Sequence, residues 1–258
     1  MAEKITVHNM ASVGIIFRES DPGTIFIDIK DGGYPIKAFC WMMCPIGGNW
    51  IGESARYDRN PRHTFSRELV EELLLEKQET SLEEAKLLGL NPDQDSYTIA
   101  KKVAPTSDDT KKLVHLKSTL ISAATPFGDF LVNIPKSVLD HGVPDNTRPG
   151  YSSLFTYWLV PVKEQEWSTL VELHKKFGNL SVESVAVITS LDEIISTQRY
   201  TCCGHDRIMQ KFFMDMGCAL ASEYPLLDGI SCEYMDMPLD SYKEYIGRYD
   251  ILRHPFKK

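Results

Sequence analysis

The feature that most constrains this chain is a short amphipathic segment whose predicted helix carries three glutamates on one side. Residues 67–75 read RELVEELLL. On an α-helix, residues three and four apart share a face, so Glu68, Glu71 and Glu72 are predicted to project together. The opposite, core-facing side is predicted to consist of Leu69, Val70, Leu73 and Leu74. Like charges at this spacing destabilise a helix by about 0.2–0.5 kcal/mol per pair. A hard divalent cation would remove that penalty.

A strand and a glycine-rich stretch precede this helix. Residues 39–44 are predicted to form the strand, and Pro45 follows it. Next come the pairs Gly47-Gly48 and Gly52-Glu53. Glycines at the end of a strand permit unusual backbone angles and the close approach of a ligand. The sequence therefore predicts the order strand, glycine loop, acidic helix.

Residues 47–75 resemble the signature box of the Nudix hydrolases in these glycines and in the run Arg67-Glu68-Leu69-Val70-Glu71-Glu72. Two features depart from the box. Thirteen residues separate Glu53 from Arg67 where the family has seven, an insertion of six. Leu74 also stands where the family has a glycine.

The resemblance implies a Nudix-like α/β/α sandwich around a mixed sheet, with an inserted or elaborated helical region. It implies a pyrophosphohydrolase that cleaves the diphosphate linkage of a nucleoside diphosphate derivative with Mg²⁺ or Mn²⁺. Glu68, Glu71 and Glu72 would bind the metal, and Glu72 or Glu53 would accept a proton. Arg67 would point away from the metal face and pair with Glu53. Glu183 is a candidate for a further carboxylate from outside the box.

Two other functions remain open at this stage. One is a catalytically weak or inactive Nudix-fold module that binds a nucleotide without cleaving it, because fold alone does not establish activity. The other is a helical scaffold protein with an incidental acidic face.

The extra residues of the box, 54–62, contain three arginines at a spacing of three: Arg56, Arg59 and Arg62. One interpretation is a solvated loop with scattered charge, since loops tolerate insertions. The other is phosphate binding, because guanidinium groups bind phosphate in a bidentate manner.

Composition limits the compartment and the partners. The 258 residues carry a net charge of -8, which disfavours broad binding to nucleic acid or to an anionic membrane. The sequence shows neither a signal peptide nor an apolar stretch long enough to span a membrane, so a cytoplasmic location is expected. Cys202, Cys203 and His205 could in principle bind zinc, but their spacing is not that of structural zinc sites. Reduced, partly buried thiols are predicted instead.

The remaining elements follow from hydrophobic periodicity and turn residues. Residues 12–17 and 24–29 are predicted to form a hairpin that turns at residues 21–23. Further strands are predicted at 129–134, 154–162 and 185–189, and helices near 81–84 and at 108–122, 166–177 and 205–222. The predicted organisation is a Nudix-like domain over 1–200 with an insert at about 76–150. Residues 201–258 would form a helix and tail that pack on this domain or on the partner in a homodimer.

Overall fold

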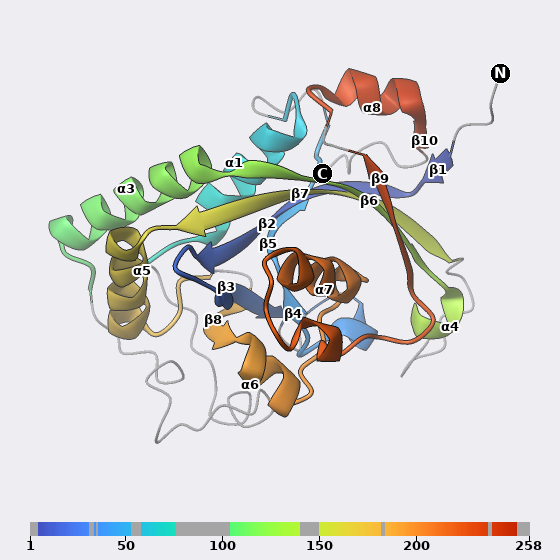
Figure 1. Ribbon diagram of the computed structural model, residues 1–258. Helices are drawn as coiled ribbons and strands as arrows, with labels where there is room; N and C mark the ends of the chain where they lie inside the picture. The colour runs from blue at the N-terminus through green and yellow to red at the C-terminus, as the bar shows by residue number, and fades with distance from the viewer. Residues whose placement is uncertain are drawn as a thin grey trace.

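The structure is a computed structural model, shown in Figure 1. It describes residues 5–30, 34, 36–52, 58–75, 104–139, 150–181, 184–236 and 239–251. Several predictions lie outside these residues: the helix near residue 81, and the roles of Glu53, Arg56 and Glu183.

An eight-stranded mixed sheet forms the centre of the described structure, in the order β4-β3-β2-β7-β6-β9, with β5 paired to β2 and β8 paired to β3. Its strands are β2 (Asn9–Arg18), β3 (Asp21–Lys30), β4 (Met43–Cys44), β5 (Ile46–Asn49), β6 (Thr125–Ile134), β7 (Tyr151–Val162), β8 (Ser184–Ser190) and β9 (Ser231–Asp236). The pair β2–β7 is parallel and the other pairs are antiparallel. The hairpin predicted from the sequence is confirmed as β2–β3. Its turn was predicted at the wrong residues, because Asp21 already belongs to β3.

Strands β2 and β3 diverge beyond their hairpin, and the chain from β4 to β5 fills the space between them. Paired positions of β2 and β3 lie only between Ile16 and Arg18 on β2. Farther from the turn, β4 pairs with β3, and β5 pairs with the first half of β2. Gly47 and Gly48 therefore lie within strand β5 rather than in a loop, which corrects the prediction from the sequence. The strand predicted at 39–44 is likewise reduced to β4, after a 3₁₀ turn at Lys37–Phe39.

Helices cover both faces of this sheet (Figure 1). On one face lie α1 (Pro61–Glu72), α3 (Ser107–Ala123) and α5 (Glu164–Phe177), which share a core with Ile16, Phe26 and Trp158. On the other face, α6 (Leu191–Ser196) and α7 (His205–Asp215) share a core with Ile15, Ile25 and Ile27. Alternate residues of β2 and β3 thus point into different cores, as strand geometry requires. The α/β/α sandwich around a mixed sheet is the architecture expected from the sequence, and the helical-scaffold alternative is wrong.

Two described elements beyond residue 200, α7 and β9, belong to the central sheet structure. β9 pairs with β6, and α7 buries Ile208 and Phe212 against the sheet. The helix predicted at 205–222 ends early, at Asp215. Gly217, two residues later, has a positive φ of 73°. A short 3₁₀ turn follows at Ala221–Glu223. Part of the segment predicted as an insert also forms central structure, namely α3 and β6.

Three further elements, α8 (Tyr242–Arg248), β1 (Ile5–Val7) and β10 (Tyr249–Ile251), pack at one end of the sheet. A short helix, α4 (Lys136–Leu139), follows β6. Tyr242 of α8 stacks on Trp50 with ring centroids 4.7 Å apart. β1 and β10 pair in parallel. None of the helices in the described ranges is long and apolar enough to cross a membrane.

Candidate functional site

Helix α1 begins at a well-formed N-cap. The Asn60 side chain accepts a hydrogen bond from the His63 amide at 2.9 Å, and Pro61 occupies the first turn, where no amide donor is needed. The Ser12 hydroxyl donates to the Pro61 carbonyl at 2.7 Å and joins the helix start to β2. The loop predicted over 54–62 therefore ends at Asn60, and Arg62 belongs to the helix.

The buried stripe of α1 differs from the predicted one at two positions. Leu69 is fully buried as expected and so is Phe65, but Val70 is 45% exposed and Glu72 is only 5% exposed. At 100° per residue, the stripe set by Phe65 and Leu69 continues to position 72, so a carboxylate enters the interior. Glu72 is thus separated from the exposed Glu71, and the predicted division into an acidic and an apolar face is wrong there.

The chain leaves α1 in an extended conformation. Leu73 has φ −85° and ψ 103°, and it bridges to Ser181. The Leu74 amide donates to the Leu180 carbonyl at 2.9 Å. This pairing ends the helix without a left-handed residue, so Leu74 is compatible with the position where the Nudix box has glycine.

Two glutamates of α1 lie directly against the two glycines of β5. The Gly47 amide donates to Oε2 of Glu72 at 3.1 Å. A Cβ built on Gly48 would lie within 2.6 Å of the Cδ and both carboxylate oxygens of Glu68, so the Glu68 carboxylate occupies the space that a side chain at 48 would take. Gly47 has φ 142°, and a Cβ there would collide with the backbone of β2. The glycine pair therefore permits the contact between strand and acidic helix.

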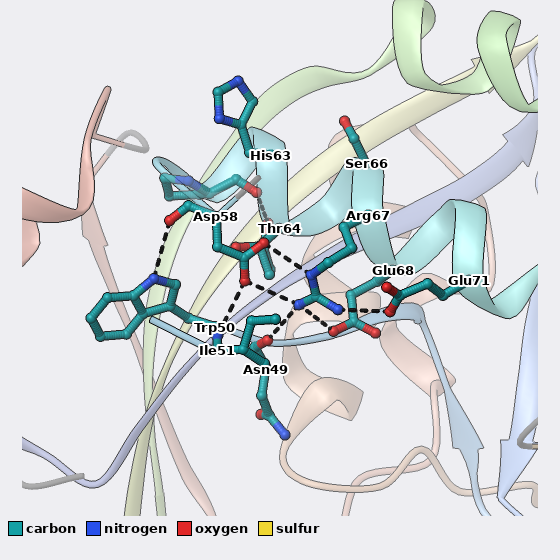
Figure 2. Close-up of polar contacts among 12 residues, drawn as sticks. Asn49, Trp50, Ile51, Asp58, His63, Thr64, Ser66, Arg67, Glu68 and Glu71 are labelled. Atoms are coloured by element: carbon teal, nitrogen blue, oxygen red, sulfur yellow. Dashed lines mark hydrogen bonds and ion pairs between the residues drawn. The ribbon is translucent and has the colours of Figure 1, made fainter. Parts of the chain in front are cut away.

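Arg67 lies among the carboxylates instead of pointing away from them (Figure 2). Its Nη1 donates to Glu71 at 2.8 Å, and its Nη2 lies 2.7 Å from Oε1 of Glu68. Nη2 also donates to the Asn49 carbonyl at 2.9 Å. The predicted orientation of Arg67 is wrong, because i,i+4 spacing brings its guanidinium over Glu71. Its predicted partner Glu53 lies outside the described residues.

The fully buried partner of Arg67 is Asp58, which the sequence did not single out. Asp58 accepts from Nε of Arg67 at 2.9 Å and from Nη2 at 3.1 Å, a bidentate pair. It also accepts from the Ile51 amide at 3.1 Å, and its carbonyl accepts from the Trp50 indole at 3.2 Å (Figure 2). The extra residues between Glu53 and Arg67 thus supply the carboxylate that fixes Arg67. The sequence signal for this role of Asp58 was an acidic residue two positions before the helix N-cap, Asn60.

Of the two predicted phosphate-binding arginines that the structure describes, Arg62 is directed elsewhere. Its guanidinium donates to the carbonyls of Ile121 and Ala124 at 2.9 and 3.1 Å and lies 5.5 Å from the centre of the Trp158 ring. It therefore connects α1 to the end of α3. Arg59 is exposed immediately before the helix.

Buried charges surround Glu72. Burial, followed by the neighbouring charges of Asp28 and Glu68, raises the pKa of Glu72 well above its usual range, while Lys30 opposes this shift. Asp28 is buried on β3, where Oδ2 accepts from Ser181 at 3.1 Å and from Ser184. Its Oδ1 has no hydrogen-bond partner within the described part of the chain. The region therefore concentrates negative charge that Lys30 balances only in part.

These residues fit a hard divalent cation in some respects. Glu68 and Glu72 meet at the glycine pair, and the unpartnered oxygen of Asp28 belongs to the same group of charges. Carboxylate oxygens are the ligands that Mg²⁺ prefers. Glu71, however, is directed to Arg67, and the three glutamates of α1 are not among the described groups whose ligand atoms all lie within 4.8 Å of one another. Glu71 would have to release Arg67 to join the other two.

Replacement of Gly48 by Ala should displace the Glu68 carboxylate, because the new methyl group would occupy its position. We expect the dissociation constant for Mn²⁺ or Mg²⁺, measured by isothermal titration calorimetry, to rise by about tenfold or more. Gly247→Ala is the matched control, since a Cβ there meets nothing within 4 Å. Equal cation affinity of Gly48→Ala and wild type would show that Glu68 is not a ligand.

Comparisons with known proteins give little independent support. No protein-family model matches the sequence, and no curated protein matches it. Among solved structures, the chain is similar to the crystal structure of a NUDIX hydrolase from Alicyclobacillus acidocaldarius, with 13% identity and a TM-score of 0.34 over 74% of this chain and 82% of that chain. This similarity is weak. The α/β/α architecture is established by the strand pairing and the helix packing described above.

Proposed function

We propose that this protein is a divalent-cation-dependent hydrolase that cleaves the diphosphate linkage of a nucleoside diphosphate derivative. One observation carries the proposal. Glu68 and Glu72, in the segment that resembles the Nudix box, contact the Gly47-Gly48 pair of the same box across α1 and β5. That contact gives the sequence resemblance a three-dimensional counterpart.

Each side chain has a distinct part in the proposal. Glu68 and Glu72 would bind the cation, and Glu71 would complete the set from the exposed side of α1. Burial raises the pKa of Glu72 well above its usual range, and a raised pKa makes a carboxylate a stronger proton acceptor. Arg67 would orient Glu68 and Glu71 through its two ion pairs. Glu53 keeps its proposed role as the other candidate base.

A bound Mg²⁺ or Mn²⁺ would supply neutralisation of the diphosphate charge and activation of water. Binding of the remaining phosphate charge is proposed for Arg59, which is exposed beside the N-terminus of α1, and for Arg56. Arg62 is no longer part of this proposal, because its guanidinium is bound to α3 carbonyls.

A nucleotide-binding module without activity is the second candidate, and the placement of Glu71 favours it. Arg67 contacts both Glu68 and Glu71, so a basic side chain already neutralises part of the acidic group. A module of this kind would need only the glycine pair and the arginines to bind phosphate.

The deciding experiment is a substrate panel that contains nucleoside diphosphate sugars, dinucleotides, nucleoside triphosphates and capped RNA. We expect at least one compound to be hydrolysed with Mg²⁺ or Mn²⁺, and hydrolysis to stop when EDTA is added. Ligand-dependent thermal stabilisation without any product would instead support the binding module. If no compound of the panel is hydrolysed and none stabilises the protein, both proposals are contradicted.

A further inference from the structure

A second group of potential ligands lies outside the acidic site. Among the described residues, Cys44, Cys202 and His205 each offer a ligand atom within 4.8 Å of the others. All three residues are buried. Cys44 ends β4, and His205 is the first residue of α7. The sequence spacing concealed this group, because Cys44 is separated from the other two by most of the sheet.

The backbone places these side chains in a defined way. The Met43 amide donates to the Tyr200 carbonyl at 2.9 Å, and the Cys202 amide donates to the Met43 carbonyl at 2.8 Å. Two residues with positive φ follow, Cys203 at 57° and Gly204 at 77°. A non-glycine residue in this region costs about 1–3 kcal/mol and often marks a functional site. The turn brings Cys202 and His205 back to the end of β4.

The donor set has the chemistry of a zinc site. Two sulfurs and one imidazole are ligands that Zn²⁺ binds readily in tetrahedral sites. The Nδ1 atom of His205 forms a hydrogen bond with the Tyr157 hydroxyl, which leaves Nε2 to face a metal. Metal-binding histidines commonly engage their second ring nitrogen in this manner.

The two cysteines of the group differ: burial, and then hydrogen bonds with Cys203 and Cys44, raise the pKa of Cys202 well above its usual range. Burial lowers the pKa of Lys30, but nearby Cys44, Asp28 and Glu72 outweigh that effect, so Lys30 stays protonated. A hydrogen bond with Cys202 lowers the pKa of Cys44, and Lys30 and His205 act in the same direction. The group itself supplies three of the four ligands of a tetrahedral ion.

We propose that Cys44, Cys202 and His205 bind one Zn²⁺ ion that fastens β4 to the start of α7. Binding forms two Zn–S bonds and one Zn–N bond and releases the remaining thiol protons to solvent. β4 leads through Pro45 into β5, so the ion would brace the strand whose Gly47 and Gly48 contact Glu72 and Glu68 of α1. The proposal does not depend on the proposed hydrolase activity.

The test measures zinc in protein prepared without a polyhistidine tag and incubated with equimolar Zn²⁺ before desalting. Wild type should retain about one zinc per chain, measured by plasma mass spectrometry. Cys44→Ser and Cys202→Ser should each retain less than about a tenth of that. Cys218→Ser is the matched control, because Cys218 lies outside the group, and Glu72→Gln separates the zinc site from the acidic one. Both controls should retain the full amount.

A second measurement uses only the wild-type fold, in case the serine variants do not fold. Co²⁺-loaded wild type should show a thiolate-to-cobalt charge-transfer band and the d–d bands of a tetrahedral ion. Absence of zinc from wild type, absence of the thiolate band, or full zinc content in both serine variants would each overturn the proposal. A Cys44–Cys202 disulfide in freshly purified protein would overturn it as well.

Discussion

Glu72→Gln and Glu71→Gln should each lower the turnover number on the best substrate by about 10²–10³-fold, the loss that follows removal of one preorganised electrostatic contact. Each change removes one negative charge from the proposed cation site. For Glu72 the structural cost is small, because a glutamine oxygen can still accept the Gly47 amide. The substitution also removes the negative charge of the Glu72 carboxylate, which desolvation and the neighbouring charge of Asp28 make unfavourable. The free energy of unfolding of Glu72→Gln without divalent cations should therefore equal or exceed that of wild type.

The control for this experiment is Glu172→Gln. Glu172 is an exposed glutamate of α5 that pairs with Lys112. It should leave both turnover and stability near the wild-type values, since exposed ion pairs contribute about 0–1 kcal/mol. Turnover near wild type in both Glu71→Gln and Glu72→Gln would exclude the acidic helix as the metal site. A loss of turnover together with unfolding would show that these glutamates serve the fold instead.

Asp58→Ala should lower the free energy of unfolding by about 3 kcal/mol or more. Removal of one partner of a buried ion pair leaves the other charge uncompensated, which typically costs about 3–5 kcal/mol. The Asp58 side chain is 0% exposed and that of Arg67 is 12% exposed. The Ile51 amide would lose its acceptor as well. Urea denaturation followed by circular dichroism measures the change.

A double-mutant cycle isolates the pair from its surroundings. Arg67→Ala and the double variant Asp58→Ala/Arg67→Ala complete the cycle, and we expect a coupling energy of about 1 kcal/mol or more. Asp108→Ala is the surface control, because Asp108 pairs with Lys112 at 3.3 Å while its side chain is 74% exposed. Equal stability losses for Asp58→Ala and Asp108→Ala would show that the buried ion pair contributes no more to the free energy of unfolding than an exposed one.

The sequence alone predicted most of the regular elements, because their signals are local. Apolar, β-branched runs located β2 and β3, and hydrophobic periodicity located β8 and α3. In the structure, α3 begins at a capping box formed by Thr106 and Asp109. The glycine pair and the acidic helix were also predicted in the right order. Their direct contact through Gly47 and Glu72 is consistent with the interpretation that this order suggested.

Local patterns failed where the chain met distant segments. The turn before β3 and the end of α7 shifted by several residues, because neighbouring elements determine where a strand or helix stops. Val70 is exposed and Glu72 is buried because the packing of Phe65 and Leu69 on the sheet sets the rotation of α1. Arg62 binds α3 carbonyls because α3 ends beside the first turn of α1.

The residue types and their order thus came from the sequence, which determined an α/β chain with an acidic helix after a glycine pair. Tertiary structure decided which side chains meet. Asp58 lies just before the N-cap of α1 and meets Arg67 nine positions later on the helix. Cys44 joins Cys202 and His205 because a bridge between Met43 and Thr201 aligns segments more than 150 residues apart. Such contacts depend on chain closure over long separations, and no local periodicity encodes them.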